Sequence, residues 1–212
     1  MKIVFFGDSI TDASRNRSTE TIDASRFGFG FVMQTVGRLY EKSLTEYQVY
    51  NRGISGNRIV DLYARIKSDL WNLEPDLISI LIGVNDVWHE IAWNNGVELD
   101  RFEKTYRTLI EETKQKLPNA KFILCEPFVL KGEATELNYE RFLQVKDYAK
   151  VVKKLANEYG LYFLPLQEEL EAVAEKVGAN VVLRDGVHPT VQGAVVIAKQ
   201  WMKLFNDIEN DI

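Results

Sequence analysis

The sequence has 212 residues, 46% hydrophobic and 27% charged, which is long enough for one sizeable hydrophobic core and short for two independent domains. Its net charge of −5 provides no basic field that would attract a phosphate backbone, so a nucleic-acid partner is not expected. One cysteine and two histidines exclude an internal disulfide and form no cluster with zinc-site spacing, so we expect neither a metal site nor a cofactor.

The amino terminus begins with an apolar run that is too short for the core of a signal peptide. No stretch approaches the roughly 18 consecutive apolar residues that a membrane span requires. The sequence therefore predicts a cytoplasmic protein with no membrane role. No repeat, low-complexity segment or proline-rich linker divides the chain, and we expect one domain over residues 1–212.

Short apolar runs alternate with stretches of helical period, a pattern typical of βαβ units around a parallel sheet. Runs rich in Ile, Val, Leu, Phe and Tyr predict five strands, at residues 2–7, 47–52, 76–83, 121–126 and 161–165. Apolar residues three and four positions apart predict helices over 99–113 and 139–159. A last helix is expected to begin at Pro189, whose fixed φ suits a first turn.

The longest stretches without a regular pattern are residues 10–29, 84–98 and 128–138. Each of them follows a predicted strand. Ligands of open α/β sheets bind beyond the carboxyl ends of the strands, so the functional residues should be sought in these three segments.

Ser9 lies two residues beyond the first predicted strand, in the string FFGDSITD, after Gly7, which permits a tight turn. Taken alone, Ser9 or Asp8 is more simply explained as the cap of a following helix. The string RDGVHP, residues 184–189, adds Asp185 and His188 three positions apart. A serine attacks a carbonyl when an imidazole takes its proton and a carboxylate fixes the imidazole tautomer. A turn aspartate and a histidine satisfied by backbone groups explain the second string equally well.

Donors for an oxyanion are the remaining requirement of this chemistry. Gly56, in NRGISGN, could offer a backbone N–H where no side chain blocks approach, and Asn85, in IGVND, carries a neutral amide donor. Singly, each is more often a turn glycine or an Asx-turn asparagine. Together with the nucleophile, base and orienting acid, however, they complete one constellation, and no rival constellation occurs in the sequence.

The strings FGDSITD, NRGISGN, LIGVNDVW and DGVHP resemble the consecutive sequence blocks of the SGNH hydrolases, also called GDSL esterases, along nearly the whole chain. Within that family the sequence is most similar to intracellular bacterial acetylxylan esterases, which deacetylate carbohydrates. The resemblance implies a flavodoxin-like three-layer α/β/α sandwich with a five-stranded parallel sheet. It also implies a triad of Ser9, Asp185 and His188, and an oxyanion hole made by the Ser9 and Gly56 N–H groups and the Asn85 side chain.

Five residues near these motifs are candidates for substrate contact: Asp8, Arg58, Trp88, His89 and Trp93. Aromatic faces beside a polar crevice suit stacking on sugar rings, although tryptophans that anchor the segment after Asn85, which we expect to be a loop, explain the pattern as well. Arg58, like Arg15 and Arg26, could hydrogen-bond a polyol or a carboxylated sugar, but such arginines are more often solvated or paired.

The sequence therefore predicts a serine esterase that hydrolyses short-chain acetyl esters through an acyl-enzyme on Ser9. No apolar loop segment could serve as an interfacial lid, which favours a water-soluble ester. A cytoplasmic location would make the substrate an imported acetylated oligosaccharide, such as a xylo-oligosaccharide. A lysophospholipase or thioesterase of the same superfamily and a non-catalytic sugar-binding module remain as alternatives. The resemblance also implies a homo-oligomer.

Overall fold

The computed structural model describes residues 1–18 and 23–210. Within them, parallel strands form one five-stranded sheet in the order β2-β1-β3-β4-β5. The strands are β1 (Lys2–Gly7), β2 (Gln48–Gly53), β3 (Leu77–Leu81), β4 (Lys121–Cys125) and β5 (Tyr162–Leu164). The five strands predicted from the apolar runs are thus confirmed. The third ends two residues earlier than predicted, because the chain leaves the sheet after Leu81 to begin a helix at Val84.

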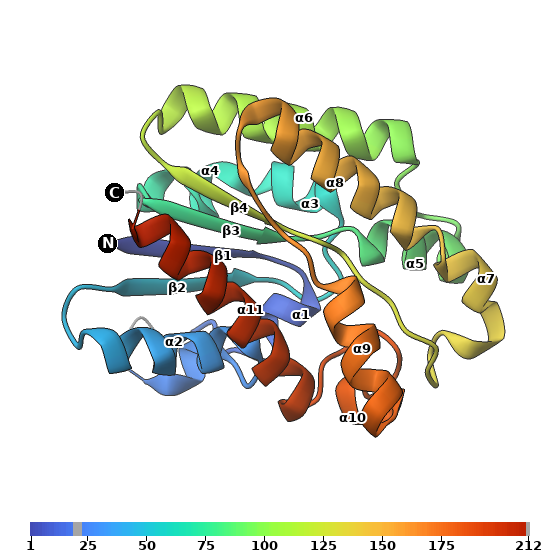
Figure 1. Cartoon of the computed structure of the whole chain (residues 1–212). Helices are drawn as coiled ribbons and strands as arrows, with labels where there is room; N and C mark the ends of the chain where they lie inside the picture. Colours follow the sequence, from blue (N-terminus) through green and yellow to red (C-terminus); the bar gives the residue numbers. More distant parts are fainter. Residues whose placement is uncertain (19–22, 211–212) are drawn as a thin grey trace.

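Helices cover both faces of the sheet (Figure 1). On one face, α2 (Phe31–Lys42) packs against α11 (Val191–Asn210). The opposite face carries α3 (Ile59–Ala64), α4 (Ile66–Asp69), α6 (Leu99–Lys116) and α8 (Val145–Tyr159). This strand order with two helical layers is the doubly wound arrangement of flavodoxin. The fold that the resemblance implied is confirmed.

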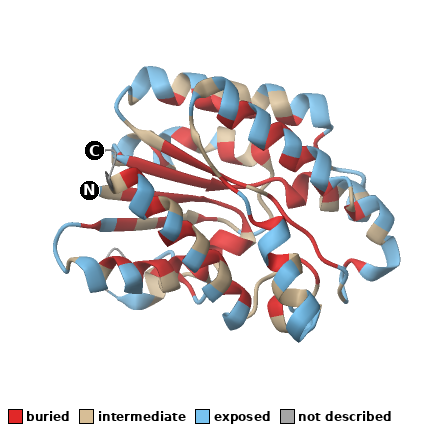
Figure 2. Cartoon of the chain, in the orientation of Figure 1, coloured by how far each residue is buried: buried red, intermediate tan, exposed pale blue. Residues whose placement is uncertain are grey.

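Neighbouring residues of the interior strand β1 face opposite helical layers. Phe5 contacts Trp201 of α11, with 5.1 Å between ring centroids, whereas the ring of Phe6 lies 4.5 Å from the guanidinium of Arg65 on the other side. Both phenylalanines are completely buried. Figure 2 shows the same pattern for the whole sheet, with buried strands and helices that are exposed only on their outer sides. A sheet covered on both faces reads as uninterrupted apolar runs, which is why the strands were predictable.

The helix predicted over 139–159 is interrupted. It consists of α7 (Tyr139–Phe142) and α8, separated by two residues in a turn. At the interruption the backbone forms hydrogen bonds between residues three positions apart, as in a 3-10 helix: Gln144 N donates to Arg141 O, and Lys146 N donates to Leu143 O. Such tightened turns change the direction of the chain, which the spacing of apolar residues alone does not reveal.

The last helix begins at Val191 and not at the predicted Pro189. Pro189 forms an isolated bridge with Leu183, which holds it in an extended conformation outside the helix. The Thr190 side chain accepts a hydrogen bond from Gly193 N at 3.2 Å, so this threonine caps the first turn.

The expectation that residues 84–98 are irregular is wrong for most of that stretch, because α5 occupies Val84–Trp93. Residues 19–22 of the expected irregular stretch 10–29 lie outside the described residues. The remaining helical elements are α9 (Gln167–Val177), which has 11 residues, and the shorter α1 (Ser9–Asp12), η1 (Ala24–Phe27), η2 (Trp71–Leu73), η3 (Glu136–Asn138) and α10 (Ala179–Val182).

The sheet register brings the predicted motifs to one edge. Gly7, at the end of β1, pairs with Gly53 at the end of β2 and with Leu81 at the end of β3. The segments that follow these three residues contain Ser9, Gly56 and Asn85. Across residues 1–18 and 23–210, no helix has the length and apolar character needed to cross a membrane.

Candidate active site

Ser9 is the first residue of α1, beyond the carboxyl end of β1. The Asp8 side chain accepts a hydrogen bond from Ile10 N at 2.9 Å and so caps this short helix. Gly7 leaves no room for a side chain, since a Cβ would lie 2.5 Å from Leu81 O. The helix-cap interpretation is therefore confirmed for Asp8, while Ser9 remains partly exposed at the edge of the sheet.

The structure brings Ser9, His188 and Asp185 together. Ser9 Oγ lies 2.9 Å from His188 Nε2, although the two residues are 179 positions apart. His188 Nδ1 lies 2.7 Å from Asp185 Oδ2. Both distances are within hydrogen-bond reach, and the imidazole contacts the hydroxyl with one nitrogen and the carboxylate with the other. This is the arrangement that nucleophilic attack by a serine requires.

The turn that carries Asp185 and His188 is fixed by its own backbone and by a neighbouring segment. Gly186 has a φ of +97°, which favours glycine, and a Cβ there would lie 2.5 Å from Leu130 O. Gly186 O accepts a hydrogen bond from Leu130 N at 2.8 Å. Arg184 N donates to His188 O at 2.9 Å and closes the turn. The acid and the base therefore keep a constant geometry with respect to each other.

The hydrogen bonds of this turn keep Asp185 ionised. Partial burial by itself would raise the pKa of Asp185. The carboxylate accepts from the His188 ring, from His188 N at 2.8 Å and from Val187 N at 3.0 Å, and together these donors hold its pKa well below the ordinary value. Asp185 can therefore orient the imidazole and balance its positive charge across the neutral pH range.

The predicted oxyanion donors lie at the same edge. Gly56 has a φ of +84°, and a Cβ there would meet nothing within 4 Å, so backbone conformation and not close approach explains the glycine. Asn85 is 6% exposed, and its Nδ2 donates to Asn57 O at 3.0 Å. One hydrogen of that amide remains for a ligand. The Asn57 carbonyl thus connects the segment of Gly56 to the side chain of Asn85.

A cavity of about 290 Å³ opens beside Ser9 and His188. Ser14, Phe29 and Arg184 form part of its wall. The sequence interpretation missed these three residues. Arg184 directly precedes Asp185 in RDGVHP and was open to inference, whereas Ser14 and Phe29 come from a stretch without a recognisable motif.

None of the five candidate substrate contacts is among the described residues that line this cavity. Asp8 is completely buried, so it does not reach a ligand. Arg58 is bound by other groups: its Nε donates to Asp61 Oδ2 at 3.0 Å, and its Nη1 donates to Asn95 O at 2.8 Å. The expectation that Asp8 contacts substrate is wrong, and Arg58 has a structural ion pair, which is the alternative the sequence left open.

The aromatic candidates belong to α5 and not to the expected loop. The Trp88 ring is partly buried and lies 5.9 Å from the ring of His188 and 5.6 Å from that of Phe142, centroid to centroid. It therefore packs behind the imidazole. His89 and Trp93 contact each other at 4.7 Å, and Trp93 is 67% exposed. None of the three lines the cavity beside Ser9 within the described part of the chain.

Two further carboxyl groups belong to residues adjacent to proposed oxyanion donors in the chain, Asp8 next to Ser9 and Asp86 next to Asn85. Burial raises the pKa of Asp8 to about 7 and that of Asp86 to about 8. Asp86 Oδ1 accepts a hydrogen bond from Ile59 N at 3.0 Å. In each aspartate, Oδ2 has no hydrogen-bond partner among the described residues. No group of three or more His, Cys, Asp or Glu side chains that could hold a metal ion occurs in the same residues.

Comparisons with known proteins identify the family of this chain. Residues 5–196 match the GDSL-like Lipase/Acylhydrolase family. An acetylxylan esterase from Geobacillus stearothermophilus is 34% identical over 95% of this chain and 92% of its own length, and its crystal structure superposes with a TM-score of 0.84 over the same shares. A GDSL-like lipase from Parabacteroides merdae is 38% identical, with a TM-score of 0.89 over 95% of this chain and 94% of that one. A match of this extent in both sequence and structure means that the chain belongs to the GDSL-like lipase/acylhydrolase family.

Proposed function

We propose that the protein is a serine esterase that removes acetyl groups from small acetylated sugars, with acetylated xylo-oligosaccharides as the substrate class. The continuous chain of contacts from Ser9 Oγ through His188 to Asp185 carries this proposal. One structure of the Geobacillus relative is described as an acetyl-xylooligosaccharide esterase, and that protein matches 95% of the present chain. A cavity of about 290 Å³ is small among ligand sites and suits a short acyl group better than a long one.

The roles of the three residues are supported by the relative as well. Three of its structures are described as catalytic mutants, and they replace one serine, one aspartate and one histidine by alanine. The aspartate and histidine of that protein are three positions apart. Asp185 and His188 have the same spacing here.

In the proposed reaction, Ser9 Oγ attacks the acetyl carbonyl carbon while His188 Nε2 takes the hydroxyl proton. The negative charge that forms on the carbonyl oxygen is stabilised by the N–H groups of Ser9 and Gly56 and by the Asn85 amide. The ester C–O bond then breaks, and the sugar leaves as an alcohol with the proton from His188. Water attacks the acetyl-enzyme in the second half, again with His188 as base, and releases acetate and free Ser9.

The acyl preference tests this proposal. A series of nitrophenyl esters should be hydrolysed fastest as the acetate, and acetylated xylo-oligosaccharides should release acetate. Ser9→Ala should abolish both turnover and covalent labelling by a serine-directed organophosphate. Faster hydrolysis of octanoate would favour the lysophospholipase or thioesterase alternative. No hydrolysis of any ester by the wild-type protein would favour the sugar-binding module.

The proposal includes the cellular setting that the sequence predicts. A cytoplasmic, single-domain enzyme would act on imported oligosaccharides and not on the polymer. The description of the Geobacillus relative as an esterase of acetylated oligosaccharides supports a small substrate. We also propose assembly into a homo-oligomer, which only the family resemblance supports.

A further inference from the structure

Asp12 is the only carboxylate among the described residues that line the cavity. It is the last residue of α1, three positions after Ser9, and it is 3% exposed. A carboxylate with so little access to water needs hydrogen-bond donors. The triad does not use Asp12, so its contacts require a separate explanation.

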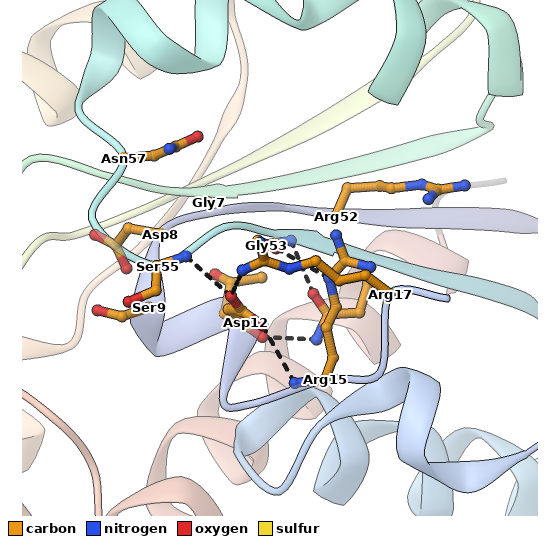
Figure 3. Close-up of polar contacts among 12 residues, drawn as sticks. Gly7, Asp8, Ser9, Asp12, Arg15, Arg17, Arg52, Gly53, Ser55 and Asn57 are labelled. Carbon is orange, nitrogen blue, oxygen red and sulfur yellow. Dashed lines mark hydrogen bonds and ion pairs between the residues drawn. The ribbon is translucent and has the colours of Figure 1, made fainter. Parts of the chain in front are cut away.

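Those donors come from two directions (Figure 3). Asp12 Oδ2 accepts a hydrogen bond from Ser55 N at 2.9 Å and forms an ion pair with the Arg17 guanidinium. Asp12 Oδ1 accepts from Arg15 N at 3.2 Å. Ser55 is 43 positions away in the chain and directly precedes Gly56, a proposed oxyanion donor. One carboxylate therefore connects the helix of the nucleophile to the segment of the oxyanion donor.

The segment Gly53 to Asn57, which we name the oxyanion loop, is also held by the backbone of Gly7 and by the side chain of Arg15. Ile54 N donates to Gly7 O at 3.0 Å, and Arg15 Nε donates to Gly53 O at 2.9 Å. Gly53 lies so close to α1 that a Cβ would be 2.2 Å from Asp12 N. These contacts fix the beginning of the loop.

Gly56 lies further along the loop, at a point where its backbone is less closely packed than that of Gly53. Its φ is +84°, and a Cβ there would meet nothing within 4 Å. The direction of the Gly56 N–H therefore depends on how the residues on its two sides are held. Asn57 donates to Ile54 O at 3.2 Å and accepts from Asn85 Nδ2. On the other side, the Ser55 N–H is held by Asp12. Loss of this hydrogen bond would allow the oxyanion donor to move relative to Ser9.

We propose that Asp12 is a positioning residue that fixes the oxyanion loop relative to Ser9. The inference rests on the proposed esterase function, because it assigns Gly56 as a donor to the transition state. A displacement of about 1 Å at a catalytic group can reduce turnover by about 10²-fold. Asp12 acts through Ser55 N and does not itself contact the reacting atoms.

The test is Asp12→Ala, which removes both acceptor oxygens, because an asparagine could still accept from Ser55 N through its amide oxygen. We expect kcat for nitrophenyl acetate to fall by about 10- to 100-fold, with KM changed by less than about 3-fold, because donor geometry matters most in the transition state. Affinity for a boronic acid, which forms a tetrahedral adduct with Ser9, should fall in proportion to kcat. A merely structural role would instead reduce the fraction of active protein and leave kcat per active site unchanged.

Asp76→Ala is the matched control. Asp76 Oδ2 likewise accepts from a distant backbone group, Lys2 N at 2.6 Å, but this contact lies at the start of β1, at the end of the strand opposite Ser9. This variant should keep kcat within about 2-fold of the wild type. Arg17→Gln removes the ion pair of Asp12 but leaves Ser55 N bonded, so it should lower kcat less than Asp12→Ala does.

Hydrogen exchange provides a measurement that needs no variant. Ser55 is an exposed residue, yet its amide should exchange much more slowly than that of an unstructured peptide because it donates to a buried carboxylate. Rapid exchange of this amide, or an Asp12→Ala enzyme with kcat within about 2-fold of the wild type, would overturn the assignment. Absence of esterase activity in the wild type would refute the proposed function, and slow Ser55 exchange would still test the contact.

Discussion

Asp185 and Asp86 are both aspartates that accept backbone N–H groups at the site. Their environments nevertheless favour the anion of Asp185 and the neutral acid of Asp86. Asp185 is partly exposed and accepts two backbone N–H groups and the imidazole, and its pKa is lowered. Asp86 is 1% exposed and accepts one backbone N–H, from Ile59, and burial raises its pKa to about 8. The number of donors, set against burial, therefore determines the charge of each acid.

This difference suits the two sides of the site. The base side needs an anion, because the imidazole becomes positively charged when it takes the Ser9 proton. The oxyanion side develops negative charge, and an additional anion beneath it would oppose that charge. Asp8 directly precedes Ser9 and Asp86 directly follows Asn85, and burial raises their pKa values to about 7 and about 8. Burial therefore favours the neutral form of both acids.

The largest effect should come from removing the anion on the base side. Asp185→Asn is expected to lower kcat by about 10³- to 10⁴-fold, because the asparagine amide would donate to His188 Nδ1 and leave Nε2 protonated. That tautomer has no lone pair for the Ser9 proton. Steady-state kinetics with nitrophenyl acetate measure the loss, and thermal unfolding serves as the folding control. A decrease of less than tenfold in a folded variant would contradict the role of Asp185.

A smaller effect is expected on the oxyanion side. Asn85→Ala removes one of the proposed donors and should lower kcat by about 10²- to 10³-fold, with little change in KM. Asn85→Asp is the matched variant, since it keeps the shape but replaces the donor with an acceptor, and it should be at least as slow. If the aspartate variant were faster than the alanine variant, Asn85 would not act as a hydrogen-bond donor in the transition state.

The smallest effect on turnover, and a distinct effect on stability, is expected for Asp86→Asn. The folded pKa of Asp86 is about 8 and its ordinary value is 3.8, so the folded state binds more protons than the unfolded state between these pH values. Its contribution to stability is therefore present at low pH and is lost as the pH rises toward 8. An asparagine side chain at this position cannot titrate, so the free energy of unfolding should fall less steeply in the variant, by up to ~1.4 kcal/mol per pH unit.

Denaturant unfolding of both proteins at several pH values measures this slope. Asp185 does not contribute to this slope, because its pKa in the folded state is lowered below the ordinary value of 3.8. Its contribution to stability is present above pH 3.8 and is lost only at more acidic pH. Equal slopes in the wild type and in Asp86→Asn would show that Asp86 is ionised in the folded protein.

Much of the fold could be predicted because burial on both faces of a sheet leaves a local signature. The strands were found as apolar runs, and α6 was found from apolar residues at helical spacing. The helix α2 has the same type of signal in Phe31, Val32, Val36 and Leu39, which are all buried, but it was not predicted. The turn between α7 and α8 and the helical state of α5 depended on packing that local spacing does not determine.

The candidate site divides in the same way. Ser9, Asp185 and His188 were identifiable because their residue types and spacing match a known chemistry. The environments of Asp8 and Trp88 were not identifiable from the sequence. The complete burial of Asp8 and the contact of Trp88 with the His188 ring depend on segments that are distant in sequence. Asp12 carried no chemical signal of its own until its contact with Ser55 was known.

The sequence by itself determined the order of the strands along the chain, the residue types available for catalysis and the family to which they belong. These properties are local, since they depend on composition and spacing within short segments. Only the tertiary structure decided which acid is charged, which residues form the cavity and what holds the oxyanion loop. Those properties depend on burial and on hydrogen bonds between residues many positions apart, and such contacts exist only once the sheet has aligned its strand ends.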